Sequence, residues 1–336
     1  MNILFTCAGR RHYLIEYFQK AKPKGSIIVG ADMQSSAPAM ALVDKKYMVP
    51  PVYATNYVEE LMRICQKEKI DAIISLNDLE LPILSENSEL FKTLGVKVLV
   101  SSREVTDICF DKWKTVEFAN GIGIETPKTY LNLQSAKRAL QLGELSFPLV
   151  IKPRWGSASI GIEFPETLDE LNMAYLLLEK KLFRSMLAEI SKTDVENAIL
   201  IQEKIEGIEY GLDVFNDLAG NNLSVYVKEK LAMRAGETDK AVLRDNRAIE
   251  EIGKRIGNHL KHIANLDCDI FERNGKYYLL EMNPRFGGGY PFSQMSGADF
   301  PAVVYAMLGN KPLKSEWFTK RYDKAFAKCD ILIPVN

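Results

Sequence analysis

The sequence has little that would build a metal-thiolate, disulfide or histidine-based centre. Its five cysteines are odd in number and stand far apart without a CxxC pair, and it contains only three histidines. Such spacing argues against a disulfide framework and against a zinc site. We therefore expect reduced thiols, as in a cytoplasmic protein, and a reaction that needs no histidine cluster.

Long hydrophobic runs and an excess of charge of one sign are also missing. No stretch reaches the roughly 18 apolar residues that a membrane span needs, and Met1 leads directly into an apolar strand pattern without a basic leader. The 43 basic and 44 acidic side chains give a formal charge of -1. This balance gives no reason to expect a nucleic-acid or membrane partner, so we predict a soluble protein that binds small molecules.

The 336 residues are enough for two or three packed units, and the first hundred have a regular pattern. Short apolar runs alternate there with amphipathic stretches of helix length, which indicates βαβ crossovers and a parallel sheet. The predicted strands are 2–7, 26–32, 71–76 and 97–100, and the predicted helices between them include 12–21 and 57–67. This pattern predicts a Rossmann-like domain over residues 1–105.

The first predicted strand is followed by Cys-Ala-Gly-Arg-Arg, which has one glycine where a dinucleotide fingerprint needs three. We therefore expect no nicotinamide cofactor, and Asp32 stays a weak substrate candidate. Asn77, Asp78 and Glu80 follow a later strand, at the edge where open α/β sheets present ligand groups. Capping of the next helix is an equally good explanation for Asn77 or Asp78.

The stretch from Pro148 to Ile162 reads PLVIKPRWGSASIGI, in which a strand ends at Lys152 and a run of small residues follows. Glycine and serine let backbone N–H groups approach phosphate oxygens, and a fixed lysine adds a positive charge. The stretch is not a Walker loop, because no GKS or GKT follows. It predicts a polyphosphate site, with an ordinary flexible hairpin as the alternative.

A second stretch, LLEMNPRFGGG over residues 279–289, places Glu281 and Asn283 on one face of a predicted strand. Asp269 lies on the preceding strand of a hairpin whose predicted turn is Asn-Gly, and it can face the same point. Carboxylate and amide oxygens together with phosphate oxygens are the ligands that Mg²⁺ prefers. Arg285 follows, and its planar guanidinium is suited to binding the phosphoryl group that is being transferred.

The two motifs, VIKP with its small-residue loop and EMNPR about 130 residues later, together resemble the ATP-grasp superfamily. The N-terminal domain followed by Lys112 is similar to its carbamoyl-phosphate synthase and biotin carboxylase branch. The resemblance implies an α/β fold, with a Rossmann-like pre-ATP-grasp domain (1–105) before a two-lobed α+β ATP-grasp domain (106–310). The latter would comprise a linker and first lobe part (106–145), an ATP-lid lobe (146–205) and a metal-binding lobe (206–310), followed by a tail (311–336).

The resemblance also assigns residues to ATP and to Mg²⁺, with Mn²⁺ as an alternative ion. Lys112 and Lys152 would hold the phosphates, under a loop formed by Gly156, Ser157, Ala158, Ser159 and Gly161. Gln202, Glu203, Lys204 and Ile205 would line the adenine, largely through the backbone, and Glu209 would accept the ribose hydroxyls. The metal ligands would be Asp269, Glu281 and Asn283, and Arg285 would lie beside the γ-phosphate.

The implied activity is that of an ADP-forming ligase, which activates a carboxylate as an acyl phosphate for attack by an amine or similar nucleophile. Carboxyphosphate chemistry on bicarbonate and a non-catalytic ATP-binding regulatory subunit are the alternatives. Lys228, Arg234 and Glu237 are further candidates for substrate contact, and a mobile hairpin loop is the alternative at the last two. A homodimer is left open, and the family resemblance does not name the acceptor.

Overall fold

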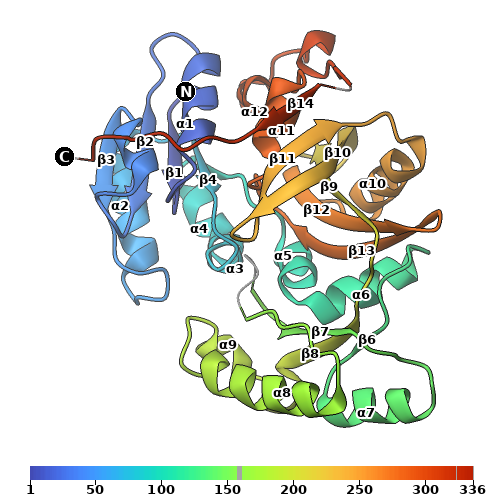
Figure 1. The fold of residues 1–336 in the computed structure, drawn as a ribbon. Coiled ribbons are helices and arrows are strands. Elements are labelled where there is room, and N and C mark those ends of the chain that lie inside the picture. Colours follow the sequence, from blue (N-terminus) through green and yellow to red (C-terminus); the bar gives the residue numbers. More distant parts are fainter. Residues whose placement is uncertain (157–160, 323, 336) are drawn as a thin grey trace. The chain divides into compact units, whose positions relative to one another are not determined.

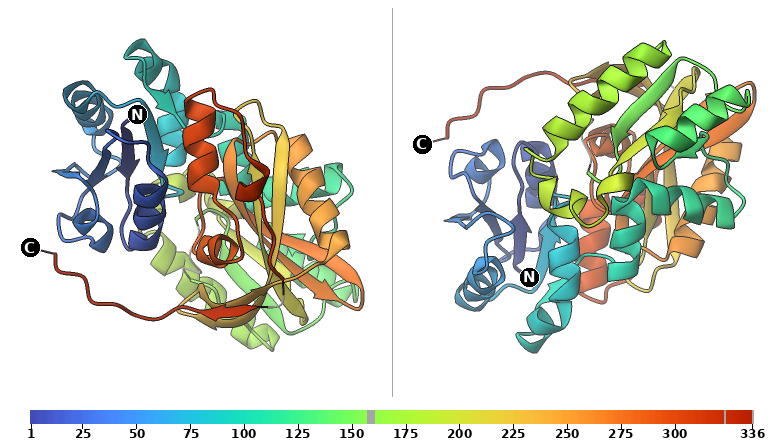
Figure 2. Two further views of the ribbon diagram at one scale, coloured as in Figure 1. Left: turned by 90° about the horizontal axis from the view of Figure 1, so that it is seen from above. Right: turned by 90° about the horizontal axis from the view of Figure 1, so that it is seen from below.

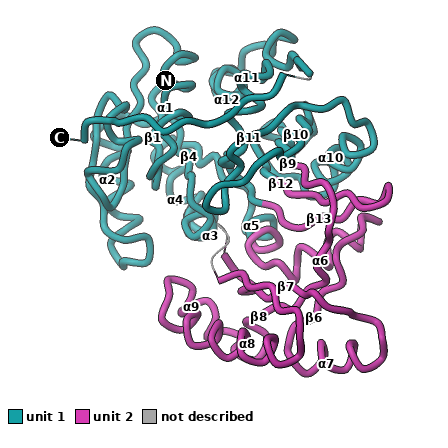
Figure 3. Tube along the Cα trace, viewed as in Figure 1, with its two compact units in different colours: residues 1–106, 211–267, 283–336 teal, residues 107–210, 268–282 magenta. Residues whose placement is uncertain are grey.

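The computed structural model of the chain describes residues 1–156, 161–322 and 324–335 (Figure 1). The chain forms two compact units, each assembled from separated stretches (Figure 3). Unit 1 comprises residues 1–106, 211–267 and 283–336, and unit 2 comprises residues 107–210 and 268–282.

Unit 1 begins with a parallel five-stranded sheet in the order β3-β2-β1-β4-β5. Its strands are β1 (Ile3–Thr6), β2 (Ile28–Asp32), β3 (Lys45–Met48), β4 (Ala72–Ser75) and β5 (Lys97–Val98). The helices of this region are α1 (His12–Ala21), α2 (Tyr57–Glu68), α3 (Leu81–Glu86) and α4 (Ser88–Thr93). The predicted parallel sheet is confirmed, and β3 is an addition at its edge, where exposed lysines leave no apolar run to detect.

Helices cover both faces of this sheet, as the blue part of Figure 2 shows. Along β1, Ile3 and Phe5 pack into one core cluster with Phe18 of α1, whereas Leu4 packs into a second cluster with Leu61 of α2. This alternation follows from the side-chain period of a strand, and burial on both faces explains why β1 is apolar throughout. Because β1 and β4 run parallel, the polar residues that follow these two strands lie at the same edge of the sheet.

Two helices separated by a single residue follow the parallel sheet: α5 (Arg103–Phe110) and α6 (Lys112–Gly121). Asp111 lies between them with extended backbone angles, φ -97 and ψ 105. Its carboxylate accepts hydrogen bonds from the backbone N–H groups of Trp113, at 2.9 Å, and Lys114. Asp111 is thus the N-cap of α6, and Lys112 becomes its first residue.

A three-stranded antiparallel sheet in unit 2 has the order β6-β8-β7. Its strands are β6 (Thr129–Tyr130), β7 (Leu149–Pro153) and β8 (Ile199–Glu203). The accompanying helices are α7 (Leu133–Gln141), α8 (Leu168–Leu182) and α9 (Ala188–Ser191). Lys152 lies near the end of β7, directly before the stretch of small residues, as the sequence predicted.

A six-stranded sheet has the order β13-β12-β9-β10-β11-β14, and the boundary between the two units passes through β9, β12 and β13. Its strands are β9 (Ile208–Asn216), β10 (Asn222–Arg234), β11 (Glu237–Leu243), β12 (Ala264–Arg273), β13 (Lys276–Asn283) and β14 (Ala325–Ala327). The remaining helices are α10 (Arg247–Leu260), α11 (Tyr290–Met295) and α12 (Phe300–Leu308). Asn274 and Gly275 both have positive φ, 55 and 74, and form the predicted turn between β12 and β13.

Among the described residues, none of the helices combines the length and apolar character needed to cross a membrane.

Candidate functional site

Lys152 is buried, with 4% of its surface exposed, and three strands hold its side chain in place. Its Nζ donates a hydrogen bond to Oε1 of Gln202 at 2.9 Å, and Nε2 of Gln202 donates to Oγ1 of Thr129 at 2.8 Å. These residues come from β7, β8 and β6, which pair side by side. The sheet therefore determines where the ammonium group lies.

The charges of three other predicted site residues act on Lys152 within unit 2: Lys112, Asp269 and Glu281. The sequence predicted phosphate or metal roles for these residues from separate stretches. Burial is the main cause that lowers the pKa of Lys152 to about 8, and the nearby charge of Lys112 lowers this pKa further. The carboxylates of Glu281 and Asp269 act on Lys152 in the opposite direction and raise the pKa. The structure therefore brings one further cation and two carboxylates within electrostatic range of Lys152.

Lys112 is also buried, and its Nζ donates a hydrogen bond to the carbonyl oxygen of Gly156. Gly156 and Gly161 have φ values of +95 and +71, which favour glycine. A Cβ at either position would lie 2.9 Å or 2.7 Å, respectively, from a leucine Cδ1. Three predicted loop residues lie outside the described part of the chain: Ser157, Ala158 and Ser159.

The predicted adenine segment runs from the end of β8 to the start of β9. The carboxylate of Glu203 accepts a hydrogen bond from Arg273 at 2.8 Å, and Lys204 lies 3.4 Å from a neighbouring glutamate. Ile205 is buried and Glu209 is half-buried on β9. Because these charged side chains have protein partners, backbone groups are the natural contacts for a base here, and the adenine role stays a prediction.

The two predicted metal carboxylates lie on neighbouring strands, Asp269 on β12 and Glu281 on β13, and both are half-buried. Asn283, the last residue of β13, is buried and belongs to unit 1. Within the described part of the chain, no group of three or more His, Cys, Asp or Glu side chains is placed to hold a metal. Two carboxylates that need phosphate oxygens to complete the coordination fit Mg²⁺ or Mn²⁺ bound together with a nucleotide.

Arg285 in unit 1 makes two ion pairs that the sequence did not indicate. Its Nη2 lies 2.8 Å from Oδ2 of Asp78, after β4, and its Nη1 lies 3.3 Å from Oδ2 of Asp267, on β12. The Arg285 side chain is 7% exposed. The guanidinium predicted to contact the γ-phosphate is thus held between two carboxylates, which fix its orientation.

Arg11 interacts electrostatically with Arg285 and Asp78. Arg11 was missed in the sequence, because the Cys-Ala-Gly-Arg-Arg stretch was compared only with a dinucleotide fingerprint. It is half-buried in the connection between β1 and α1, directly before α1, and its Nη1 donates to the carbonyl oxygen of Leu76. Burial, and then the charge of Arg285, lower the pKa of Arg11, while Asp78 and Glu237 raise it. Its position at the carboxyl end of a parallel strand was the signal that could have found it.

Glu80, a substrate candidate from the sequence, is fully buried among hydroxyl groups. Its carboxylate accepts hydrogen bonds from Tyr57 at 2.6 Å, from Thr6 at 2.7 Å, and from Ser75. Burial raises its pKa. Since this carboxylate already joins β1, β4 and α2, we interpret it as a support for the sheet edge that carries Asp78.

The candidates on β10 and β11 also have protein partners. Arg234 is exposed and lies 2.7 Å from Asp330, whereas Glu237 lies 3.2 Å from Lys328. Lys228 is buried and forms an ion pair with the buried carboxylate of Asp213. These pairs support the sheet, and contact of the three candidates with a substrate stays a prediction.

Comparison with known proteins identifies the class. The model of the PylC-like N-terminal domain matches residues 3–99, and that of the ATP-grasp domain matches residues 145–291. Residues 145–291 thus form an ATP-grasp domain, and enzymes of the ATP-grasp superfamily carry out ATP-dependent, ligase-type chemistry. The predicted fold, a parallel α/β domain followed by ATP-grasp lobes, is confirmed.

Individual relatives are distant. The chain is 25% identical to the carbamoyl phosphate synthase large chain of Clostridium beijerinckii over 304 residues, 85% of this chain and 26% of the relative. It is 24% identical to the D-alanine–D-alanine ligase of Bacillus anthracis over 295 residues, 82% of this chain and 91% of that ligase. The chain thus spans about a quarter of the synthase and most of the ligase.

Among solved structures, the biotin carboxylase domain of Hydrogenobacter thermophilus 2-oxoglutarate carboxylase, a dimer in complex with MgADP and bicarbonate, is similar in fold. Its TM-score is 0.76 at 16% identity, over 96% of this chain and 73% of that chain. At this identity the likeness establishes the fold alone.

Proposed function

We propose that the protein is an ADP-forming ligase that uses ATP to convert a substrate carboxylate into an acyl phosphate. An amine or similar nucleophile then attacks the carbonyl carbon, and phosphate leaves. The observation that carries this proposal is that the charges of Lys112, Glu281 and Asp269 all act on the buried ammonium group of Lys152 inside unit 2. Two buried cations match the charge of a triphosphate, and two carboxylates match the divalent ion that accompanies it.

In this proposal Lys112 and Lys152 bind phosphate oxygens, and Asp269 and Glu281, with Asn283, hold Mg²⁺ or Mn²⁺. The ion, when bound, supplies positive charge at the phosphate oxygens. Reactions of this kind need little covalent chemistry from the protein, because positioning and charge neutralisation supply most of the acceleration. No Ser/His/Asp triad or reactive cysteine is needed for such a step.

The acceptor should lie near Arg285, whose guanidinium would stabilise the charge that develops on the transferred phosphoryl group. Arg11 and Asp78 interact with Arg285 and come from the edge of the parallel sheet where ligands are usually presented. A cluster of both charge signs favours an acceptor that carries a carboxylate together with a polar or amine group. This supports an amino acid or a sugar acid as the first compounds to test.

The test is ADP release after mixing the protein with Mg-ATP and pools of amino acids, sugar acids and amines. Release that requires one acid and one amine, together with a condensed product in the mass spectrum, is the expected result. Release with bicarbonate alone would instead indicate carboxyphosphate chemistry. Nucleotide binding without turnover in any pool would indicate a regulatory subunit, and no binding of Mg-ATP in calorimetry would reject the proposal altogether.

A further inference from the structure

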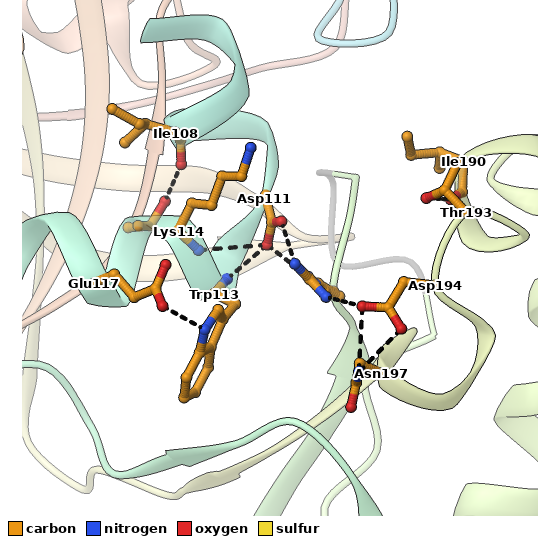
Figure 4. A network of polar contacts seen from close by, with 11 residues as sticks. Ile108, Asp111, Trp113, Lys114, Glu117, Ile190, Thr193, Asp194 and Asn197 are labelled. Atoms are coloured by element: carbon orange, nitrogen blue, oxygen red, sulfur yellow. Dashed lines mark hydrogen bonds and ion pairs between the residues drawn. The ribbon is translucent and has the colours of Figure 1, made fainter. Parts of the chain in front are cut away.

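Asp111 and Arg154 form a two-point ion pair inside unit 2. Nε of Arg154 donates to Oδ1 of Asp111 at 2.8 Å, and Nη2 donates to Oδ2 at 2.7 Å. Their side chains are only 6% and 12% exposed. Figure 4 shows the Asp111 carboxylate beside the backbone of Trp113 and Lys114 at the start of α6. The parallel bonds fix both the distance and the plane of the two groups, which a lysine could not reproduce.

Asp111 uses the same carboxylate to cap α6. Oδ1 accepts hydrogen bonds from the backbone N–H groups of Trp113, at 2.9 Å, and Lys114. In addition, the backbone N–H of Lys112 donates to the carbonyl oxygen of Arg154 at 3.1 Å. The first turn of α6 is therefore attached to Arg154, the residue after β7, through both the side chain of Asp111 and the backbone of Lys112.

Arg154 is itself anchored on its other side. Nη1 donates to Oδ2 of Asp194 at 2.8 Å, and Asp194 also accepts hydrogen bonds from Asn197 Nδ2 at 2.9 and 3.2 Å (Figure 4). The backbone N–H of Arg154 donates to the carbonyl oxygen of Ala198 at 2.9 Å. The guanidinium thus links the start of α6 to the segment that leads into β8.

We infer that Asp111 and Arg154 are positioning residues, which hold the ammonium group of Lys112 where the phosphates of ATP bind. Lys112 follows Asp111 directly, and its Nζ reaches the carbonyl oxygen of Gly156, two residues beyond Arg154. Lys152 lies two residues before Arg154, and the positive charge of Lys112 acts on it electrostatically. The ion pair therefore fixes both lysines relative to each other and to the start of the small-residue loop. This inference rests on the proposed function, because it requires that Lys112 contact a phosphate.

A purely structural ion pair would stabilise the fold without a specific link to Lys112. The two roles are distinguished by a double-mutant cycle, since residues that act through one another show non-additive effects. We propose to measure Mg-ATP affinity by calorimetry for wild type, Arg154→Gln, Lys112→Met and the double variant. Arg63→Gln, which removes an exposed ion pair with Glu60 at 2.9 Å, is the matched control, and thermal midpoints are measured for all variants.

Lys112→Met should weaken Mg-ATP binding on the order of tenfold, because it removes a charge-assisted contact. Arg154→Gln should weaken binding by a similar factor in the wild-type background and cause little further loss when Lys112 is already methionine. Asp111→Asn, which retains the helix cap but not the charge, should have the same dependence on Lys112. It also provides the test if Arg154→Gln does not fold.

Equal losses from Arg154→Gln in the presence and absence of Lys112 would overturn the inference, as would an Arg154→Gln variant with wild-type affinity. Failure of wild-type protein to bind Mg-ATP is a different result, because it rejects the proposed function and the inference together. A loss shared by Arg63→Gln would show a general effect of losing an arginine and would also overturn the positioning role.

Discussion

Binding of Mg-ATP should be accompanied by uptake of a proton at Lys152. In the free protein, burial and the charge of Lys112 lower the pKa of this lysine to about 8, despite the opposing effect of Glu281 and Asp269. Phosphate oxygens placed beside the ammonium group would favour its charged form and raise the pKa again. A group whose pKa rises on binding takes up protons, and the uptake is largest between the two pKa values.

The expected size follows from the free-state pKa of about 8. At pH 7 about nine-tenths of Lys152 is already charged, so about 0.1 proton is taken up, whereas at pH 9 the uptake is about 0.9 proton. Because protonation must then accompany binding, Mg-ATP affinity should fall about tenfold per pH unit above pH 8. Below pH 7 the contribution of Lys152 to the pH dependence should disappear.

Calorimetry in buffers with different ionisation enthalpies measures the number of protons taken up. The matched control is Lys152→Arg, because a guanidinium keeps its charge throughout this pH range and cannot take up the proton. Wild type at pH 9 should therefore take up close to one proton more than this variant. Equal proton uptake by the two proteins, with Mg-ATP bound by both, would refute the placement of Lys152 beside the phosphates.

Three further predictions concern catalysis, acid stability and packing. Glu281→Gln removes a charge facing the metal, so turnover should fall by orders of magnitude while the thermal midpoint moves little; a large loss of stability with near-normal activity would reject the metal role. His262 is fully buried against the carbonyl oxygen of Val214, and burial lowers its pKa to about 4. Since the unfolded chain binds this proton near pH 6.5, the stability contributed by neutral His262 is complete above that pH and decreases by up to about 3 kcal/mol towards pH 4. Urea unfolding at pH 5 and 7 should show this loss in wild type, and a His262→Gln variant with the same pH dependence would contradict it. Gly207→Ala would place a Cβ 2.0 Å from a backbone carbonyl oxygen of β12 and should lower the free energy of unfolding by about 1–3 kcal/mol, whereas Gly121→Ala, with open space around it, should not.

The parts of the fold that were predictable are those in which local pattern and burial agree. The buried strands β1, β2 and β4 appear as apolar runs because helices cover both faces of the sheet. The turn at Asn274-Gly275 has a local signal, because both residues adopt positive φ. The two motifs around Lys152 and Glu281 were also visible, since a run of small residues and alternating polar side chains on a strand leave short-range patterns.

The remaining features depend on partners far away in the sequence. Asp111 is a local signal for the start of α6, but its ion pair with Arg154, 43 residues later, leaves no sign in that stretch of sequence. Likewise, Arg285 is oriented by Asp78, which lies 207 residues earlier. A single sequence identifies each of these side chains as charged, but only the fold shows which of them meet.

The division of the chain into interleaved units has a consequence for synthesis on the ribosome. Unit 2 contains residues 268–282, so its last hairpin is made only after the middle stretch of unit 1, residues 211–267, has already emerged. Unit 1 in turn combines residues after 282 with residues 1–106, which are synthesised much earlier. Unit 2 is therefore complete only after the first two stretches of unit 1 have been synthesised, and unit 1 only after all of unit 2. Contacts of such long sequence separation form slowly. In the nascent chain, Ile3 and Phe5 of β1 therefore lack Tyr290 and Phe300, with which they share a core cluster, until those residues have been synthesised.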